Sequence, residues 1–304
     1  MKLSILVAVA SVFPTLSSCH AYFAGFNLPH NTASGGCKTT QDWRREFATL
    51  KSWSTGGKGN FDTVKIFSTS GCDALSNAVP AAMETGIKLW VGVWNTPSWK
   101  FDVDKAALES AIRRYPDTRR WLRGINVGSE SLYTRQVTAA ELVGQIKDVK
   151  GMIHKTLKSP WTPIGTADTW NVLVDPANRA VTDVSNVVVM NAFPFWEGIH
   201  IDGALERLKF NIRETRKAIG WEKFFIIGET GWPTDGRDFG AATPSIRNQQ
   251  KYWKTAACWL QTTSYPWLWF EGFDEPSKAD SADKLDYERS FASNFQKPKF
   301  DLHC

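Results

Sequence analysis

The sequence predicts an α/β fold, a single (β/α)8 TIM barrel, and three observations support this fold class. Eight short apolar runs recur along the chain, and most are apolar on both faces, as strands of a covered parallel sheet are. Longer stretches with helical periodicity lie between them. The 304 residues contain no linker or composition shift that would divide the chain, and barrels of this type commonly reach this length.

The predicted strands are the runs at residues 22–28, 64–67, 88–93, 122–127, 164–167, 187–190, 224–228 and 268–273. Amphipathic stretches predict helices at 41–51, 105–114, 139–157, 202–218 and 245–260. Thr138 and Glu141 form a capping-box pattern before the third helix, and Pro116 ends the second. An open doubly wound sheet is the alternative, but it would normally carry a glycine-rich phosphate loop after an early strand, which this chain lacks.

The first 21 residues predict a signal peptide. Lys2 supplies the positive end, residues 3–13 form an apolar run too short to span a bilayer, and Pro14 breaks that run. We expect cleavage after Ala21 and a secreted catalytic domain of residues 22–304, located outside the cell or in the cell wall. A buried first strand or helix is the alternative interpretation. No later segment is apolar for long enough to cross a membrane, so no membrane association is expected.

The cysteines agree with an oxidising compartment. Cys19 would leave with the signal peptide, and four cysteines would remain in the mature chain. An even number predicts two disulfides with three possible connectivities. We favour Cys37 with Cys72 and Cys258 with Cys304, because each bond closes a moderate loop and stabilises by about 4 kcal/mol in the chain-entropy model. Buried free thiols are the alternative.

Charge and motif content exclude several classes of function. The formal net charge is +5, but basic and acidic residues are interleaved without a basic stripe, so nucleic acid is not an expected partner. No metal and no cofactor are expected, because the scattered histidines have no His or Cys at ligand spacing. The segment Gly-Ser-Glu-Ser at 128–131 lacks the second glycine of a nucleophile elbow, which disfavours a serine hydrolase.

Two carboxylates stand where a barrel places its chemistry, at the carboxyl ends of strands. Glu130 ends the fourth run and Glu229 ends the seventh, and small residues next to each leave room for a ligand. Such a pair suits glycosidic bond cleavage, in which one carboxyl donates a proton while the other attacks or stabilises the anomeric carbon. Retention requires a separation of about 5 Å and inversion about 6.5–9.5 Å. A lone glutamate after a strand is usually a cap or a surface charge, but two in matched glycine-rich contexts favour catalysis.

At these motifs the chain resembles glycoside hydrolase family 17, the β-1,3-glucanases. The motifs are Val-Gly-Ser-Glu at 127–130 and Gly-Glu-Thr-Gly-Trp-Pro at 228–233, and the resemblance extends over residues 23–273. Gly-Ser-Glu followed by Leu-Tyr at 132–133 resembles the fungal cell-wall branch, which includes β-1,3-glucanosyltransferases. The resemblance implies a retaining mechanism with Glu130 as acid/base and Glu229 as nucleophile. It also implies β-1,3-glucan or laminari-oligosaccharides as substrate.

The resemblance also carries over to the eighth run and its loop. There Glu275 and Lys278 would help to set the electrostatics around the nucleophile. Two positions depart from the family pattern. Relatives with Asn before the acid/base can bind the sugar 2-hydroxyl, but Ser129 stands here, and the sixth run places Asn191 and Phe193 where many relatives carry Tyr nearby.

Aromatic residues at or just after strand ends are candidates for stacking on sugar rings. We expect Asn191, Phe193, Phe195, Trp196 and Trp232 to contact substrate, beside Glu275 and Lys278, with Glu197 binding hydroxyls. Trp196, Glu197 and Tyr133 are expected on the side of the cleft that receives the leaving or acceptor sugar.

Three questions stay open at this point. The balance between hydrolysis and transfer depends on how well the acceptor side binds sugar and excludes water. A β-1,4-glycanase on the same barrel is an alternative, since glutamates on strands four and seven serve several such families. A non-catalytic cell-wall glucan-binding protein is a third hypothesis, against which the two intact glutamates stand. We expect a monomer.

Overall fold

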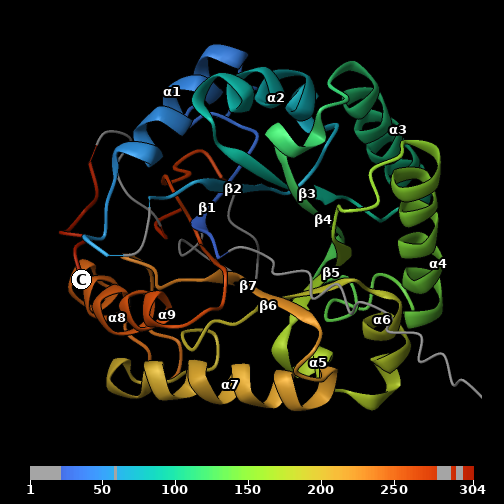
Figure 1. Cartoon of the computed structure of the whole chain (residues 1–304). Coiled ribbons are helices and arrows are strands. Elements are labelled where there is room, and N and C mark those ends of the chain that lie inside the picture. The colour runs from blue at the N-terminus through green and yellow to red at the C-terminus, as the bar shows by residue number, and fades with distance from the viewer. Residues whose placement is uncertain (1–21, 58–59, 279–288, 292–296) are drawn as a thin grey trace, which may run out of the picture.

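Eight parallel strands close into one barrel in sequence order, with β1 paired to β8 (Figure 1). The computed structural model describes residues 22–57, 60–278, 289–291 and 297–304. The closed parallel barrel confirms the predicted (β/α)8 fold, and every predicted run overlaps one of its strands. The strands are β1 (Ala24–Leu28), β2 (Thr63–Ile66), β3 (Lys88–Val93), β4 (Leu122–Ser129), β5 (Ile164–Thr169), β6 (Val187–Asn191), β7 (Phe224–Thr230) and β8 (Trp267–Trp269).

Helices surround the barrel on its outside (Figure 1). They are α1 (Thr40–Ser52), α2 (Ala74–Thr85), α3 (Ser98–Arg114), α4 (Ala139–Lys150), α5 (Trp170–Leu173), α6 (Arg179–Val184), α7 (Ala204–Ile219), α8 (Ile246–Tyr252) and α9 (Cys258–Thr262). The predicted helix at 139–157 is α4 followed by a π-helical turn, and the one at 245–260 contains α8, a π-helical turn and α9. The predicted capping box of Thr138 and Glu141 is present.

The sequence did not predict α2, α5 and α6. Pro80 lies inside α2, and an internal proline usually ends a helix because it removes one backbone donor. The other two helices have four and six residues, which is too short for a helical period to be recognised.

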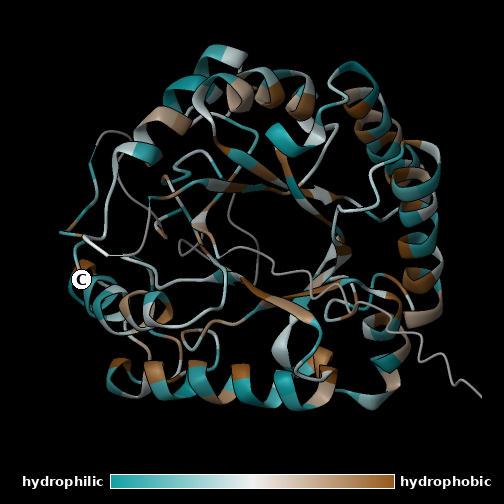
Figure 2. Cartoon of the chain, viewed as in Figure 1, coloured by the Kyte–Doolittle hydropathy of each residue, from teal (hydrophilic) through white to brown (hydrophobic). Residues whose placement is uncertain are grey.

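The apolar core has two parts, one inside the barrel and one between the strands and the helices. The inner part is small and consists of Phe23, Trp90, Ala167, Val187, Val189, Ile226 and Leu268. The larger outer part joins the other faces of the strands to the buried faces of the helices. Figure 2 shows the expected consequence, with hydrophobic and hydrophilic residues alternating along the surrounding helices.

The barrel interior also holds polar residues, and these lie toward the site. Val64 and Ile66 belong to the outer core, so the alternation of the strand turns Lys65 into the barrel, where it is fully buried. Asn27 and Asn126 are buried there as well, and Asn126 accepts a hydrogen bond from the Trp90 indole at 3.1 Å. A layer of amide and ammonium groups therefore underlies the carboxyl ends of the strands.

Both favoured disulfides are present, which confirms their connectivity. Cys37 after β1 is bonded to Cys72 after β2, and Cys258 at the start of α9 is bonded to Cys304. The predicted signal peptide at 1–21 lies outside the described residues. Within the described ranges, no helix has both the length and the apolar character needed to cross a membrane.

Candidate active site

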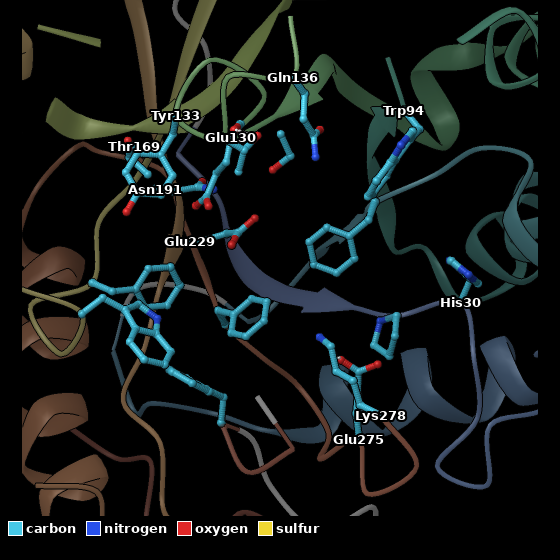
Figure 3. Close-up of a pocket in the computed structure, with 18 of the residues that line it drawn as sticks. His30, Trp94, Glu130, Tyr133, Gln136, Thr169, Asn191, Glu229, Glu275 and Lys278 are labelled. Carbon is cyan, nitrogen blue, oxygen red and sulfur yellow. Dashed lines mark hydrogen bonds and ion pairs between the residues drawn. The ribbon is translucent and has the colours of Figure 1, made fainter. Parts of the chain in front are cut away.

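A cavity of about 1110 Å³ lies at the carboxyl ends of the strands, and both Glu130 and Glu229 line it. Figure 3 shows Glu229 near the middle of this cavity, with Glu130, Asn191 and Tyr133 on one side. His30, Glu275 and Lys278 lie on the opposite side. The structure thus brings the two predicted glutamates, which are 99 positions apart in the sequence, to one site.

A shift in strand register points Glu229 into the cavity. The pairing of β7 with β8 shifts between Ile227 and Thr230, and shifts of this kind change the direction of a side chain. Thr230 points outward, where its hydroxyl lies 2.7 Å from the hydroxyl of Tyr252 on α8. Strand β7 needs glycine before Glu229, because a Cβ on Gly228 would lie 2.2 Å from Cγ1 of Val189.

Glu130 is reached by a similar irregularity at the end of β4. The pairing of β4 with β5 shifts between Asn126 and Ser129, and Gly128 has a φ of 73°. A Cβ on Gly128 would lie 2.5 Å from Oγ of Ser131, so both space and backbone conformation require glycine. Glu130 itself has a φ of 55°, and its N–H donates to the carbonyl of Ala167 at 2.9 Å.

Buried asparagines from the barrel interior hold both irregular segments. Nδ2 of Asn126 donates to the carbonyl of Gly128 at 2.8 Å, and Nδ2 of Asn27 donates to the carbonyl of Gly228 at 3.0 Å. Each catalytic candidate therefore follows a glycine whose carbonyl is fixed by an internal amide. Neither asparagine was among the predicted site residues.

Glu229 is paired with a lysine that the sequence analysis missed. Nζ of Lys65 lies 2.5 Å from Oε1 of Glu229, and the lysine side chain is completely buried. The ammonium also lies 4.6 Å from the ring centroid of Phe67, a cavity residue. Only the ionised form of Glu229 can make this ion pair. A signal was present, since Lys65 is the one charged residue in the apolar run at 64–67, and charges are rare inside a covered strand.

Asn191 connects the two glutamates. It is a register partner of Glu229 across β6 and β7, and its Nδ2 donates to Oε1 of Glu130 at 3.0 Å (Figure 3). The side chain is buried, and its Oδ1 has no hydrogen-bond partner among the described residues. The sequence predicted Asn191 as a substrate contact, and the structure places it in the cavity, with its side chain on Glu130 and its backbone beside that of Glu229.

Asp168 lies behind Glu130 and was also missed. Ala167 faces the barrel interior, so Asp168 points outward, beneath the turn that follows β4, where it is fully buried. Its carboxylate accepts hydrogen bonds from the N–H of Leu132 at 3.1 Å and of Thr169 at 2.9 Å. Burial is the main cause that raises the pKa of Asp168 to about 7, and the negative charge of nearby Glu130 contributes to the same shift.

Most of the other predicted contacts line the cavity. Phe193 packs edge-on against Phe270 at 5.7 Å and Phe291 at 5.8 Å, and it presents an apolar ring beside Glu229 rather than a hydroxyl. Tyr133 is 54% exposed on the turn that carries Glu130. The predicted contacts that line the cavity are Tyr133, Asn191, Phe193, Trp196, Glu197, Glu275 and Lys278.

The prediction was wrong for Phe195 and Trp232, which are fully buried and do not line the cavity. Their rings pack against each other edge-on at 5.2 Å, and the indole of Trp232 donates to the carbonyl of Thr243. Both side chains support the wall from behind, because Phe195 also packs edge-on against Trp196 at 5.0 Å. Position after a strand end could not tell which side of the loop each ring occupies.

Three charged residues of the cavity take part in ion pairs. Glu197 forms an ion pair with Arg207 at 2.5 Å and accepts a hydrogen bond from Asn211 at 2.6 Å. Glu275 and Lys278 form an ion pair at 3.2 Å on the side of the cavity where His30 lies (Figure 3). The carboxylates of Glu197 and Glu275 are therefore held in place by protein groups.

Several cavity residues were not predicted as substrate contacts, among them His30, Gln136, Trp170 and Phe239. Trp94 is 43% exposed at the end of β3. Its backbone N–H donates at 2.7 Å to Asp104, a buried aspartate of α3 that also accepts the N–H of Thr69 at 3.1 Å. In the described part of the chain, no group of three or more His, Cys, Asp or Glu residues is arranged to hold a metal ion.

Comparisons with known proteins agree with this geometry. The chain matches the model of the BtgE/BtgC glycoside hydrolase domain over residues 25–292. It is 32% identical to a glucan 1,3-beta-glucosidase of Saccharomyces cerevisiae, over 99% of this chain and 97% of that protein.

Solved structures from Rhizomucor miehei are also similar. A family 17 β-1,3-glucanosyltransferase is 26% identical, with a TM-score of 0.78 over 93% of this chain and 97% of that one. An active-site mutant of the β-1,3-glucanosyltransferase, in complex with laminaritriose, is 28% identical, with a TM-score of 0.76 over 89% of this chain and 92% of that one. The chain therefore belongs to the BtgE/BtgC family of glycoside hydrolase domains.

Proposed function

We propose that this protein is a retaining β-1,3-glucan-active glycosidase in which Glu229 is the nucleophile and Glu130 the acid/base. One observation carries the proposal: two glutamates at the ends of β4 and β7 face the same cavity, and their neighbours differ. The ammonium of Lys65 pairs with the carboxylate of Glu229, as a nucleophile requires. Glu130 accepts a hydrogen bond from the uncharged amide of Asn191 and lies near the carboxyl group of Asp168.

The reaction has two steps. In the first, an oxygen of Glu229 attacks the anomeric carbon of the sugar while Glu130 donates its proton to the leaving glycosidic oxygen. In the second, Glu130 removes a proton from the incoming hydroxyl group, whose oxygen attacks the same carbon and releases Glu229. Two inversions at one carbon restore its configuration.

The similar proteins support β-1,3-glucan as the substrate, since a relative is named a glucan 1,3-beta-glucosidase and a solved neighbour binds laminaritriose. The cavity suits a chain of sugars, because exposed aromatic rings lie on both of its sides. Trp94 and Tyr133 are examples, and such rings stack on the apolar faces of sugars.

Transfer to a second glucan chain is part of the proposal. The similarity to β-1,3-glucanosyltransferases supports it, as does the wall beside Glu130 that includes Tyr133 and Trp196. A sugar hydroxyl held by this wall competes with water for the glycosyl-enzyme. We further propose that residues 1–21 are cleaved and that the chain is secreted to the cell exterior or cell wall, where it acts as a monomer. The two disulfides support secretion, because such bonds persist in oxidising compartments.

Incubation with laminari-oligosaccharides tests the function. We expect the β-anomer to appear first in proton NMR spectra, with some products longer than the substrate. Shorter products alone would eliminate transfer as the main activity. Cleavage of cellulose or mannan without laminarin cleavage would favour a β-1,4-glycanase.

The Glu229→Ala variant tests the proposed nucleophile. Turnover should fall about 10⁴-fold or more, and azide should restore product of inverted configuration. Glu197→Gln is a matched control, because it changes a cavity glutamate that is paired with Arg207, and it should cost far less. Unchanged turnover by Glu229→Ala would show that Glu229 is not the nucleophile, and glucan binding without turnover by the wild type would indicate a non-catalytic glucan-binding protein.

A further inference from the structure

The turn after β4 depends on a side chain from the next strand. Glu130 begins this turn, and its carbonyl accepts the N–H of Thr134 at 2.9 Å. Asp168 on β5 lies beneath the turn and accepts the N–H of Leu132 at 3.1 Å. Because Asp168 is fully buried, this contact is fixed by the barrel wall and not by solvent. The turn that carries Glu130 is thus anchored to β5.

The electrostatic surroundings of Asp168 are simple. The titratable group that faces it is Glu130, whose negative charge raises the pKa of Asp168. The N–H groups of Thr169, Leu132 and Tyr133 lower that pKa. Its register partner on β6 is Met190, which carries no charge. The helices packed against β5 have uncharged residues at their buried positions: Leu142, Ile146 and Val149 from α4, Leu173 from α5, and Val181 and Thr182 from α6.

We infer that Asp168 is a positioning residue for the acid/base, because its buried carboxyl group fixes the turn that carries Glu130 through the backbone N–H of Leu132. The inference rests on the proposed function, in which Glu130 donates a proton in the first step. A proton donor must lie within hydrogen-bond reach of the leaving oxygen. Asp168 thereby holds Glu130 where it can protonate the leaving group.

The Asp168→Asn variant separates this role from general support of the fold. The change keeps the size of the side chain, but it turns an amide NH2 toward a backbone N–H. On laminari-oligosaccharides, whose leaving sugars need a proton, kcat/KM should fall at least about tenfold.

An activated substrate provides the readout that a merely structural role would not change. With 2,4-dinitrophenyl β-laminaribioside, departure of the phenolate needs no proton, so kcat/KM of Asp168→Asn should stay within about threefold of the wild-type value. Asp104→Asn is the matched control, because Asp104 is another buried aspartate that holds cavity loops through backbone N–H groups. This control should affect both substrates equally.

Equal losses on both substrates would overturn the inference. That outcome differs from failure of the proposed function, in which the wild-type enzyme itself would not cleave laminari-oligosaccharides. A second measurement needs no change at Asp168. In Glu130→Gln, removal of the like charge should lower the pKa of Asp168, as followed by carbon-13 NMR of its carboxyl group. An unchanged titration of Asp168 in that variant would also contradict the inference.

Discussion

Glu229 at the end of β7 and Glu130 at the end of β4 reach one cavity from two regions that are built alike. Each follows a register shift and a glycine, and each glycine carbonyl accepts a hydrogen bond from a buried asparagine amide. The regions differ in the charge beside the carboxylate. Lys65 from β2 pairs with Glu229, whereas Asp168 from β5 lies near Glu130.

This difference teaches that the backbone aims the two carboxylates and that side chains from other strands make their surroundings different. The same strand-end arrangement delivers a glutamate in both regions, so the arrangement alone assigns neither role. The two neighbours lie 164 positions from Glu229 and 38 positions from Glu130 along the sequence. Changing these two neighbours, and then the two asparagines, tests each part of the comparison separately.

The largest effect is expected from removing the charge beside Glu229. Lys65→Met leaves a nearly buried carboxylate without its cation, and breaking a buried ion pair costs about 3 to 5 kcal/mol. We expect the free energy of unfolding at neutral pH to fall by that amount in urea titrations. The kcat/KM for laminari-oligosaccharides should fall about 10³-fold, because Glu229 then loses the cation that stabilises its ionised form.

A double variant is the control for Lys65. Lys65→Met combined with Glu229→Gln removes both charges, so it should be more stable than Lys65→Met alone. If the single and double variants were equally stable, the ion pair would not be the reason for the loss. The two regions would then differ less than their contacts indicate.

Much of the fold and part of the site could be predicted from the sequence. Apolar runs identified the strands, and glutamates after two of them identified the carboxylates, because barrel geometry places strand ends around one cavity. Lys65 and Asp168 have the same kind of signal, a charge within or just after an apolar run. Their importance depends on which residue each faces across the barrel, and a pattern along one strand does not contain that information.

The failures at Phe195 and Trp232 have a related cause. Both follow strand ends, as the true cavity residues Phe193 and Trp196 do, but their rings turn into the core behind the wall. Aromatic side chains serve core packing and sugar stacking equally well, so residue type does not distinguish the two. Only the path of the loop decides which face of the wall each ring occupies.

The pH dependence of stability should reveal the raised pKa of Asp168, the carboxyl group beside Glu130. The pKa of Asp168 is raised to about 7 in the folded state, so the folded protein holds this proton more tightly than the unfolded chain. The resulting stabilisation is fully present below the unfolded pKa, near 4, and is lost as pH rises through about 7.

Unfolding titrations of the wild type and Asp168→Asn across this pH range measure that contribution. The difference in free energy of unfolding should change by about 3 kcal/mol between pH 4 and pH 8, in the direction that disfavours the wild type at high pH. A difference that stays constant with pH would mean that Asp168 titrates normally.

The smallest effects are expected from the asparagines, because they act on the backbone that the two regions share. Asn27→Ala and Asn126→Ala each leave a buried glycine carbonyl without its amide donor, which costs about 1 to 3 kcal/mol of stability. Each should lower kcat/KM on laminari-oligosaccharides about tenfold, because the following glutamate is held less firmly.

The distinction between the two asparagines appears with the activated aryl substrate. Asn27 supports the segment of Glu229, whose attack is needed for every leaving group, so Asn27→Ala should lose about tenfold on both substrates. Asn126 supports the segment of Glu130, whose proton the activated leaving group does not need, so Asn126→Ala should lose little there. If both variants lost equally on the two substrates, the asparagines would stabilise the barrel interior as a whole. The separate control of the two carboxylates would then reside in Lys65 and Asp168.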